Sequence, residues 1–300
     1  MSSFRIRRTF VTALTVALLA GTLAPIVAAR PEWRDPTEDR WVEVRSEHFR
    51  VISNAKERRA RELAIELERF RVALAHLTRG FELDGSVPTV MFAFRNDARL
   101  KPYKQHRDGG TMNVSGFFQP TPFKNFIALD ASAAAGSMRV VFHEYFHAVM
   151  DATLGGLPLW LGEGLAEYYS TFDTIGSSTR VEIGRAIEDH LNYLALVDRI
   201  SWDELFATTQ QSPTYNEGTR QGAFYAQSWL LVHYLTSTEE LSKGLGRYLT
   251  ALRNGADPED AFEPSIGVSR ATLTAGADAY RKNTRFAYRT WNEEDGVGLD

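Results

Sequence analysis

The chain of 300 residues contains no cysteine, which removes two kinds of stabilisation at once. It forms no disulfide, and a metal site in it must use nitrogen and oxygen ligands instead of thiolates. A protein of this size does not require disulfides, because it is long enough to bury one large core or two small ones. Internal repeats and low-complexity segments are also absent from the sequence.

Long hydrophobic runs are absent after residue 29, so no membrane span is expected in that part of the chain. Before that point, three arginines precede the apolar stretch Phe10–Leu23, and the small residues Val27–Ala29 follow it. This order predicts a secretory signal peptide over residues 1–29, with the mature protein in the bacterial periplasm or outside the cell. The alternative is that the segment stays uncleaved as an N-terminal membrane anchor.

An excess of positive charge is absent as well. The formal charge is −4, and three arginines but no acidic residue precede residue 30, so the remainder of the chain carries −4 − 3 = −7. The basic run Arg58–Arg61 lies among glutamates on an expected helix and is most simply a solvated face. Nothing in this charge favours nucleic acid as a partner.

The segment Met138–Met150 contains neither glycine nor proline, and its apolar residues recur at helical spacing. Inside it lies an H-E-x-x-H motif that begins at His143 and ends at His147. On a helix the two imidazoles share one face about 6 Å apart along the axis, so both can bind one metal ion. Glu144 lies too far round the helix to be a ligand but near enough to act on a water molecule beside the ion. The alternative is a buried pair of histidines that is merely hydrogen-bonded.

A catalytic zinc site needs a third protein ligand and one open position. Asp151 lies too far along the helix from His143 to share an ion with it, and the longer H-E-x-x-H-x-x-G-x-x-H pattern is absent. The third ligand must therefore come from another element.

A second helix is expected directly after the first, because Gly155–Gly156 ends one helix and Pro158 suits the first turn of the next. Glu163 and Glu167 lie four residues apart and share a face of this second helix. Glycines flank Glu163 on both sides, which predicts that the two helices approach closely and bring Glu163 to the metal. The alternative is a solvated pair of acidic side chains.

The sequence W-L-x-E-G-x-A after H-E-x-x-H resembles the gluzincin metallopeptidases, the clan that includes thermolysin and the M1 aminopeptidases. Within the clan it is most similar to bacterial peptidase-MA-like domains, a group mostly of unknown function. The resemblance covers residues 41–285 in the general order of elements, but only the two helices carry specific sequence motifs. Fifteen residues separate His147 from Glu163, fewer than in thermolysin or the M1 enzymes, which fits a tighter helical hairpin.

The resemblance implies a role for each residue of the site. Glu163 corresponds to the third ligand of one Zn²⁺ ion, and Glu167 to the acid that orients the first histidine. Glu144 would be the general base for hydrolysis of a peptide bond. The clan also uses a tyrosine or histidine from its helical half to stabilise the charge on the carbonyl oxygen. Tyr225 is the first candidate for this role, with a core aromatic as the alternative reading, and His233 is the second candidate.

The expected fold class is α+β and zincin-like, with a small mixed sheet and a helix before the metal helices and a helical half after them. In the clan the cleft lies between the two halves. The expected regions are the signal peptide 1–29, an α/β subdomain 30–133, a metal-binding helical hairpin 134–172, a helical subdomain 173–291 and an acidic tail 292–300. Strands are expected at 41–52, 87–94, 111–118 and 123–129, and helices at 54–77, 183–196, 202–208, 218–237, 240–253, 257–263 and 270–285.

The expected function is zinc-dependent hydrolysis of a peptide or protein substrate. Two alternatives stay open. One is a zinc-bearing binding module of the cell envelope without activity, and the other is a hydrolase of a non-peptide amide such as a cell-wall bond. No wall-binding repeat or lectin-like segment is visible in the sequence.

Overall fold

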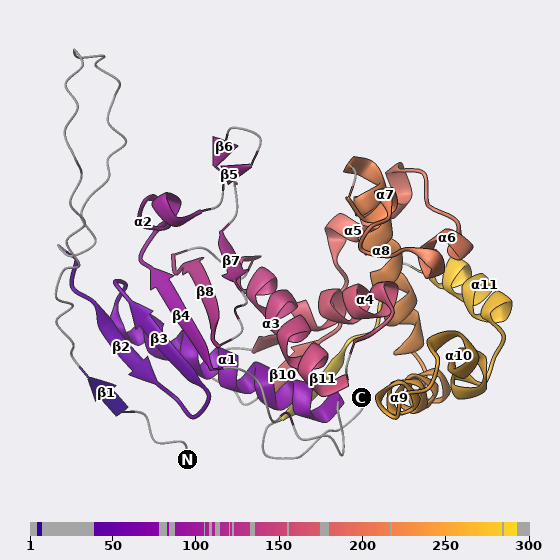
Figure 1. Ribbon diagram of the computed structural model, residues 1–300, viewed down its shortest axis with the longest axis horizontal. Helices are drawn as coiled ribbons and strands as arrows, with labels where there is room; N and C mark the ends of the chain where they lie inside the picture. Colours follow the sequence, from indigo (N-terminus) through magenta and orange to yellow (C-terminus); the bar gives the residue numbers. More distant parts are fainter. Residues whose placement is uncertain are drawn as a thin grey trace, which may run out of the picture. The chain divides into compact units, whose positions relative to one another are not determined.

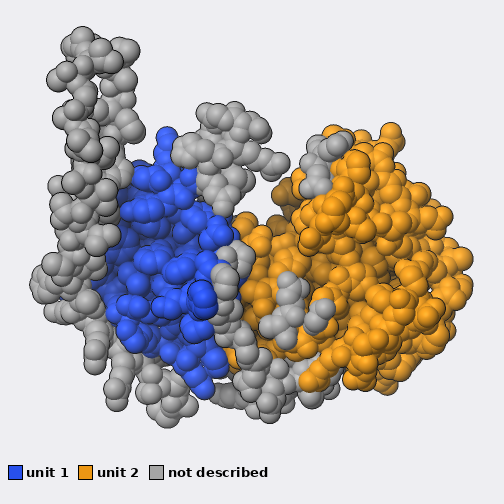
Figure 2. Space-filling model, viewed as in Figure 1, with its two compact units in different colours: residues 1–69, 87–137 blue, residues 70–86, 138–300 orange. Residues whose placement is uncertain are grey.

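A computed structural model describes residues 5–7, 39–77, 83, 88–104, 106–107, 110–111, 115–119, 121, 123–132, 136–154, 156–174, 180–216, 218–283 and 285–292. The chain has an α+β fold with a sheet in the N-terminal half and a mostly helical C-terminal half, which confirms the predicted class (Figure 1). It divides into two compact units (Figure 2). Unit 1 contains residues 1–69 and 87–137, and unit 2 contains residues 70–86 and 138–300.

Unit 1 is built on a six-stranded sheet in which the middle pairs are parallel. The order of its strands is β1 (Arg5–Arg7), β2 (Val42–Arg45), β3 (Phe49–Ser53), β4 (Thr89–Phe94), β8 (Asn125–Asp130) and β7 (Gly116–Gln119). A parallel pair needs a long crossover, and helix α1 (Glu57–Leu77) lies between β3 and β4 in the chain. The segment 41–52, whose alternation predicts a strand or a hairpin, forms the antiparallel pair β2 and β3.

The central strands of this sheet are buried along most of their length. Five of the six residues of β4 are buried, and five of the six residues of β8 are buried. Such continuous burial is typical of strands that are covered on both sides. Three short elements follow β4. Of the strand expected at 111–118, Thr111 ends one short strand, residues 116–118 belong to β7, and residues 112–114 lie outside the described part of the chain. The short elements are α2 (Asp97–Leu100), the 3₁₀ helix η2 (Lys101–Tyr103) and the two-stranded ribbon β5 (His106–Arg107) with β6 (Gly110–Thr111).

Strand β1 belongs to the predicted signal peptide, and the rest of residues 1–29 lies outside the described part of the chain. β1 pairs antiparallel with β2, so cleavage after Ala29 would leave β2 as an edge strand. Among the residues that the structure describes, no helix has the length and apolar character needed to cross a bilayer.

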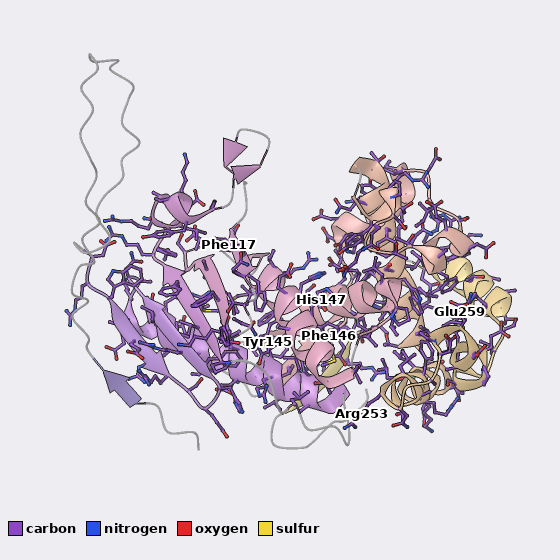
Figure 3. The ribbon with its side chains drawn as sticks, viewed as in Figure 1. Phe117, Tyr145, Phe146, His147, Arg253 and Glu259 are labelled. Carbon is purple, nitrogen blue, oxygen red and sulfur yellow. The ribbon has the colours of Figure 1, made fainter. Side chains whose placement is uncertain are left out.

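Unit 2 contains the two expected metal helices together with the C-terminal helices. They are α3 (Gly136–Leu154, from Met138 onward in this unit) and α4 (Leu159–Ser170). Tyr145 and Phe146 of α3 are fully buried, while His147 beside them is only partly covered (Figure 3). An aromatic cluster holds the apolar side of α3. Its ring pairs are Phe70 with Phe142 at 4.4 Å, Phe142 with Phe172 at 5.2 Å and Phe146 with Tyr169 at 5.6 Å.

Helix α4 packs most closely against α8 (Gly218–Leu235), and a glycine makes this approach possible. A Cβ atom on Gly164 would meet the carbonyl oxygen of Ser228 and lie 2.7 Å from Cγ2 of Val232. The sequence predicted that both glycines around Glu163 permit close packing of α4 against α3. That reading is wrong for Gly164, which faces α8, and Gly162 leaves ordinary contact distance, 3.9 Å, to Cε1 of His147.

The remaining helices follow the predicted order with small shifts at their ends. They are α5 (Glu188–Leu196), α6 (Trp202–Ala207), α7 (Pro213–Asn216), α9 (Glu239–Arg253), α10 (Pro258–Ile266) and α11 (Arg270–Tyr280). The four-residue helix α7 was not expected. The helix expected from residue 183 begins only at Glu188, because residues before it form a strand.

A three-stranded sheet in unit 2 was also missed. β10 (Arg180–Ile183) pairs on one side with β9 (Asp173–Thr174) and on the other with β11 (Arg289–Asn292). Strands of two to four residues carry too few positions for a period of two to be recognised, and β11 comes from the far end of the chain. Of the expected acidic tail, Asn292 ends β11, and residues 293–300 lie outside the described part.

The close approach at Gly164 gives a stability prediction. Gly164→Ala should lower the free energy of unfolding by about 1–3 kcal/mol, because backbone atoms of α8 must move to admit the methyl group. Gly246→Ala in α9 is the matched control, since no atom lies within 4 Å of its Cβ position. That variant should gain up to about 1 kcal/mol from helix propensity. Urea unfolding followed by circular dichroism measures both, and equal changes in the two variants would contradict the packing argument.

Candidate metal centre

His143 and His147 project from the same side of α3, as their four-residue spacing predicts. Their ring centroids lie 4.9 Å apart, and the two Nε2 atoms are 3.3 Å apart. Both side chains are partly covered, with 13% and 27% of their surface exposed. The two nitrogens therefore face one point that is accessible from outside.

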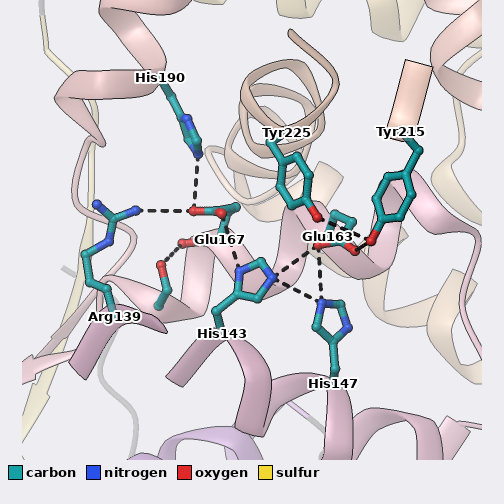
Figure 4. A network of polar contacts seen from close by, with 9 residues as sticks. Arg139, His143, His147, Glu163, Glu167, His190, Tyr215 and Tyr225 are labelled. Atoms are coloured by element: carbon teal, nitrogen blue, oxygen red, sulfur yellow. Dashed lines mark hydrogen bonds and ion pairs between the residues drawn. The ribbon is translucent and has the colours of Figure 1, made fainter. Parts of the chain in front are cut away.

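Glu163 of α4 completes a triangle with these nitrogens (Figure 4). Its Oε2 atom lies 3.2 Å from His143 Nε2 and 3.3 Å from His147 Nε2. Only 4% of Glu163 is exposed, although it is ionisable. Burial of a lone carboxylate is unfavourable, so these contacts compensate its loss of hydration.

The triangle has the dimensions of three ligands around a tetrahedral ion. Donors that lie about 2.0–2.1 Å from tetrahedral zinc are about 3.3–3.4 Å from each other. The three separations between the donor atoms are 3.2, 3.3 and 3.3 Å. Two imidazoles and one carboxylate are also a ligand set that suits zinc and leaves a fourth position open.

Glu167 lies one turn beyond Glu163 and contacts the far nitrogen of the first histidine. Its Oε1 atom is 3.3 Å from His143 Nδ1, and its Oε2 atom is 3.2 Å from both Arg139 Nη2 and His190 Nε2. A carboxylate at Nδ1 favours the tautomer that carries its proton there. When the ring is neutral, the lone pair of His143 Nε2 is then directed toward the other two ligand atoms.

Two tyrosines lie on the side of Glu163 Oε1, the carboxylate oxygen that does not face the histidines. Tyr215 of α7 donates its hydroxyl to Glu163 Oε1 at 2.8 Å. Tyr225 of α8 donates to the Tyr215 oxygen at 3.2 Å, and its ring centroid lies 6.2 Å from that of His143. The structure thus brings the first candidate for the stabilising donor, Tyr225, to the ligand group.

Glu144 has no hydrogen bond or ion pair with any residue that the structure describes, and its side chain is partly buried. Its negative charge helps to raise the pKa of both Tyr215 and Tyr225, which places it near the same group.

The second candidate, His233, does not lie at the ligand group. It is 1% exposed, and Nε2 donates to the Gly184 carbonyl at 2.7 Å. Its Nδ1 accepts from the Tyr280 hydroxyl at 3.0 Å. Burial lowers its pKa to about 4, despite the hydrogen bond to Gly184. With both ring nitrogens engaged in the core, His233 connects elements of the fold and is not available as a donor at the site.

Electrostatics couple the ionisable groups strongly. Burial disfavours the charged form of His143, but the hydrogen bonds and charges of Glu163 and Glu167 outweigh it and raise its pKa to about 10. Burial likewise opposes ionisation of Glu163, yet the two histidines lower its pKa to about 2. Burial and then the charge of Glu163 raise the pKa of Tyr215 to about 12, so its hydroxyl is a proton donor at neutral pH.

Three residues of this network were not identified from the sequence: Arg139, His190 and Tyr215. Arg139 precedes His143 by four residues on the same helix, so same-face spacing could have indicated it. His190 lies 23 residues after Glu167, and only the fold brings its Nε2 atom to that carboxylate. Tyr215 carries no signal, because 52 residues separate it from Glu163.

The coupled pKa values predict how pH affects the metal-free chain. His143 has a folded pKa above its usual 6.5, so its contribution to stability is complete below pH 6.5 and disappears as pH rises toward 10. Glu163 has a folded pKa below its usual 4.5, so its contribution is complete above pH 4.5 and disappears as pH falls toward 2. The site should therefore stabilise the fold most between about pH 4.5 and 6.5.

The free energy of unfolding of chelator-treated protein, measured in urea from about pH 2 to about pH 10, tests this prediction. His143→Gln is the matched control, because the alkaline decline should shrink when the titrating imidazole is removed. The same alkaline decline in His143→Gln and in the unmodified chain would contradict the assignment.

Comparison with known families gives one match. Residues 139–252 match the model of DUF1570, which is described as a protein of unknown function. The matched segment begins in α3, ends in α9 and includes all three residues of the triangle as well as Tyr215 and Tyr225. No curated protein matches the chain.

Proposed function

We propose that the chain is an exported zinc-dependent peptidase of the gluzincin type. The observation that carries this proposal is the triangle of donor atoms from His143, His147 and Glu163, whose sides of 3.2–3.3 Å fit a tetrahedral zinc ion. The H-E-x-x-H motif and the resemblance of the second helix to the gluzincin pattern support the same reading. Export follows from the signal peptide expected over residues 1–29.

In this proposal the three side chains hold one zinc ion. Bound zinc supplies Lewis-acid chemistry, which polarises a carbonyl and lowers the pKa of water toward about 7. Glu167 holds the Nδ1 proton of His143 and so keeps its Nε2 lone pair available. Arg139 and His190 fix the second oxygen of Glu167 and limit its rotation.

Glu144 is the proposed general base. Its carboxylate takes a proton from the attacking water and passes it to the nitrogen of the departing amine. The absence of a fixed partner for Glu144 among the described residues suits this role, because an engaged carboxylate would first have to break an ion pair.

Tyr225 is the proposed donor to the carbonyl oxygen of the substrate. Its hydroxyl is bonded to Tyr215, so it must turn away from that partner to reach a substrate. Burial and the charge of Glu163 hold its pKa well above the usual value, which keeps it protonated throughout the neutral range. A protonated hydroxyl can stabilise developing negative charge by donating a hydrogen bond.

The first test concerns the base. Glu144→Gln should lower the rate of casein hydrolysis by about 10²–10⁴-fold, because the amide cannot accept the proton. Its zinc content, measured by elemental analysis, should equal that of the unmodified chain, since residue 144 is not a ligand. Peptidoglycan is assayed in parallel.

Each outcome points to a different function. Cleavage of peptidoglycan but not casein would favour a hydrolase of cell-wall amides. A zinc-loaded chain that cleaves neither substrate would contradict the enzyme proposal and favour a binding module of the cell envelope.

The second test concerns the ligands. Glu163→Ala should remove most of the zinc affinity, because it deletes one of three ligands. Glu167→Ala should weaken binding by about 10–100-fold, since it deletes only a partner of a ligand. Competition with a chromophoric chelator measures both constants, and equal, negligible losses in the two variants would show that the ligand assignment is wrong.

A further inference from the structure

The two oxygens of Glu163 lie in different surroundings. Oε2 faces His143 Nε2 and His147 Nε2, at 3.2 and 3.3 Å. Oε1 accepts the hydroxyl of Tyr215 at 2.8 Å, on the other side of the carboxylate (Figure 4). One oxygen is thus directed to the metal position and the other is held away from it.

We propose that Tyr215 is a positioning residue that keeps Glu163 a one-oxygen ligand of the metal. The inference rests on the proposed metal site and adds to it the residue that decides how the carboxylate binds. A carboxylate can bind an ion through one oxygen or through both. Binding through both would raise the coordination number and fill the space that the fourth, open position of a catalytic site requires.

The hydrogen bond from Tyr215 opposes two-oxygen binding. A hydrogen bond to a charged acceptor is stronger than one between neutral groups, and the buried setting of Glu163 leaves little water to replace it. To bring Oε1 to the ion, the carboxylate would have to break this bond. Tyr225 does not restrain Glu163 Oε1 directly, because its hydroxyl contacts Tyr215 and not Glu163.

The surroundings of Tyr215 hold it in this orientation. Its ring stacks on Tyr225, with centroids 5.9 Å apart, and meets the edge of Phe224 at 5.7 Å. Beside it, Thr214 is buried and its hydroxyl donates to Glu204 of α6. Arg220 of α8 forms an ion pair with the same carboxylate. The short helix α7 is therefore fastened to α6 and α8, which fixes the donor before any metal binds.

The test compares metal binding by Tyr215→Phe with that of the unmodified chain. Phenylalanine retains the ring stacking but lacks the hydroxyl. Zinc affinity, measured by chelator competition, should fall by about 10–100-fold, as expected for a residue that orients a ligand. The Co²⁺-substituted protein should also lose visible absorption intensity, because four-coordinate cobalt absorbs more strongly than cobalt with a fifth ligand atom.

Another tyrosine provides the control. Tyr248→Phe, whose hydroxyl donates to the Pro258 carbonyl in another part of the unit, reports the general effect of this substitution. Thr214→Val removes the hydrogen bond that fastens α7 to α6, so zinc affinity and cobalt absorption should change in the same direction as in Tyr215→Phe. If Tyr215→Phe does not fold, Thr214→Val tests the inference in its place.

The outcomes separate this inference from the proposed function. If the unmodified chain binds Zn²⁺ and Co²⁺ but Tyr215→Phe binds them with the same affinity and spectrum, only the positioning role is overturned. If the unmodified chain binds neither ion, the metal site and this inference fail together.

Discussion

The arrangement of unit 2 around its polar centre depends on one buried charge, the carboxylate of Glu163. A carboxylate that is 4% exposed is unfavourable unless hydrogen bonds or positive charges replace its water. Its two oxygens have three partners, the imidazoles of His143 and His147 and the hydroxyl of Tyr215. These partners come from two helices, α3 and α7, and Glu163 itself lies on α4, so one buried side chain links the positions of three helices.

The fold provides this geometry through the packing of residues that are direct sequence neighbours of the three ligands. Phe142 and Phe146 anchor α3 in an aromatic cluster, which fixes the face on which the histidines lie. Gly164 lets the backbone of α4 approach α8, and the neighbouring residue Glu163 is directed to the histidines. Because protein interiors are close-packed, a small error at either contact would be transmitted to the ligand atoms.

The site is balanced electrostatically in two ways. Without an ion, a protonated His143 lies between the carboxylates of Glu163 and Glu167 and compensates their charge. In the proposed metal-bound state, the ion would supply the positive charge and the imidazole would bind as a neutral base. Binding would then release a proton, while Glu167 would keep its contact with Nδ1. The charge of the two carboxylates would thus be compensated in both states.

The sequence by itself determined the α+β class, the helical positions of the H-E-x-x-H motif and the identity of the triangle, His143, His147 and Glu163. Helical period fixes which residues of one helix share a face, and the absence of cysteine limits the choice of ligands. Glu163 was assigned from the resemblance to the gluzincin pattern and from the second helix expected beside the first. Only the tertiary structure decided that Gly164 permits the close approach of α4 to α8 and that His233 belongs to the core. It also decided that Tyr215 contacts Glu163 and that His190 contacts Glu167. The pairing of β10 with β11 could not be predicted from the sequence either. These contacts join residues that are far apart in the chain, and their formation depends on how whole elements pack, which local spacing does not encode.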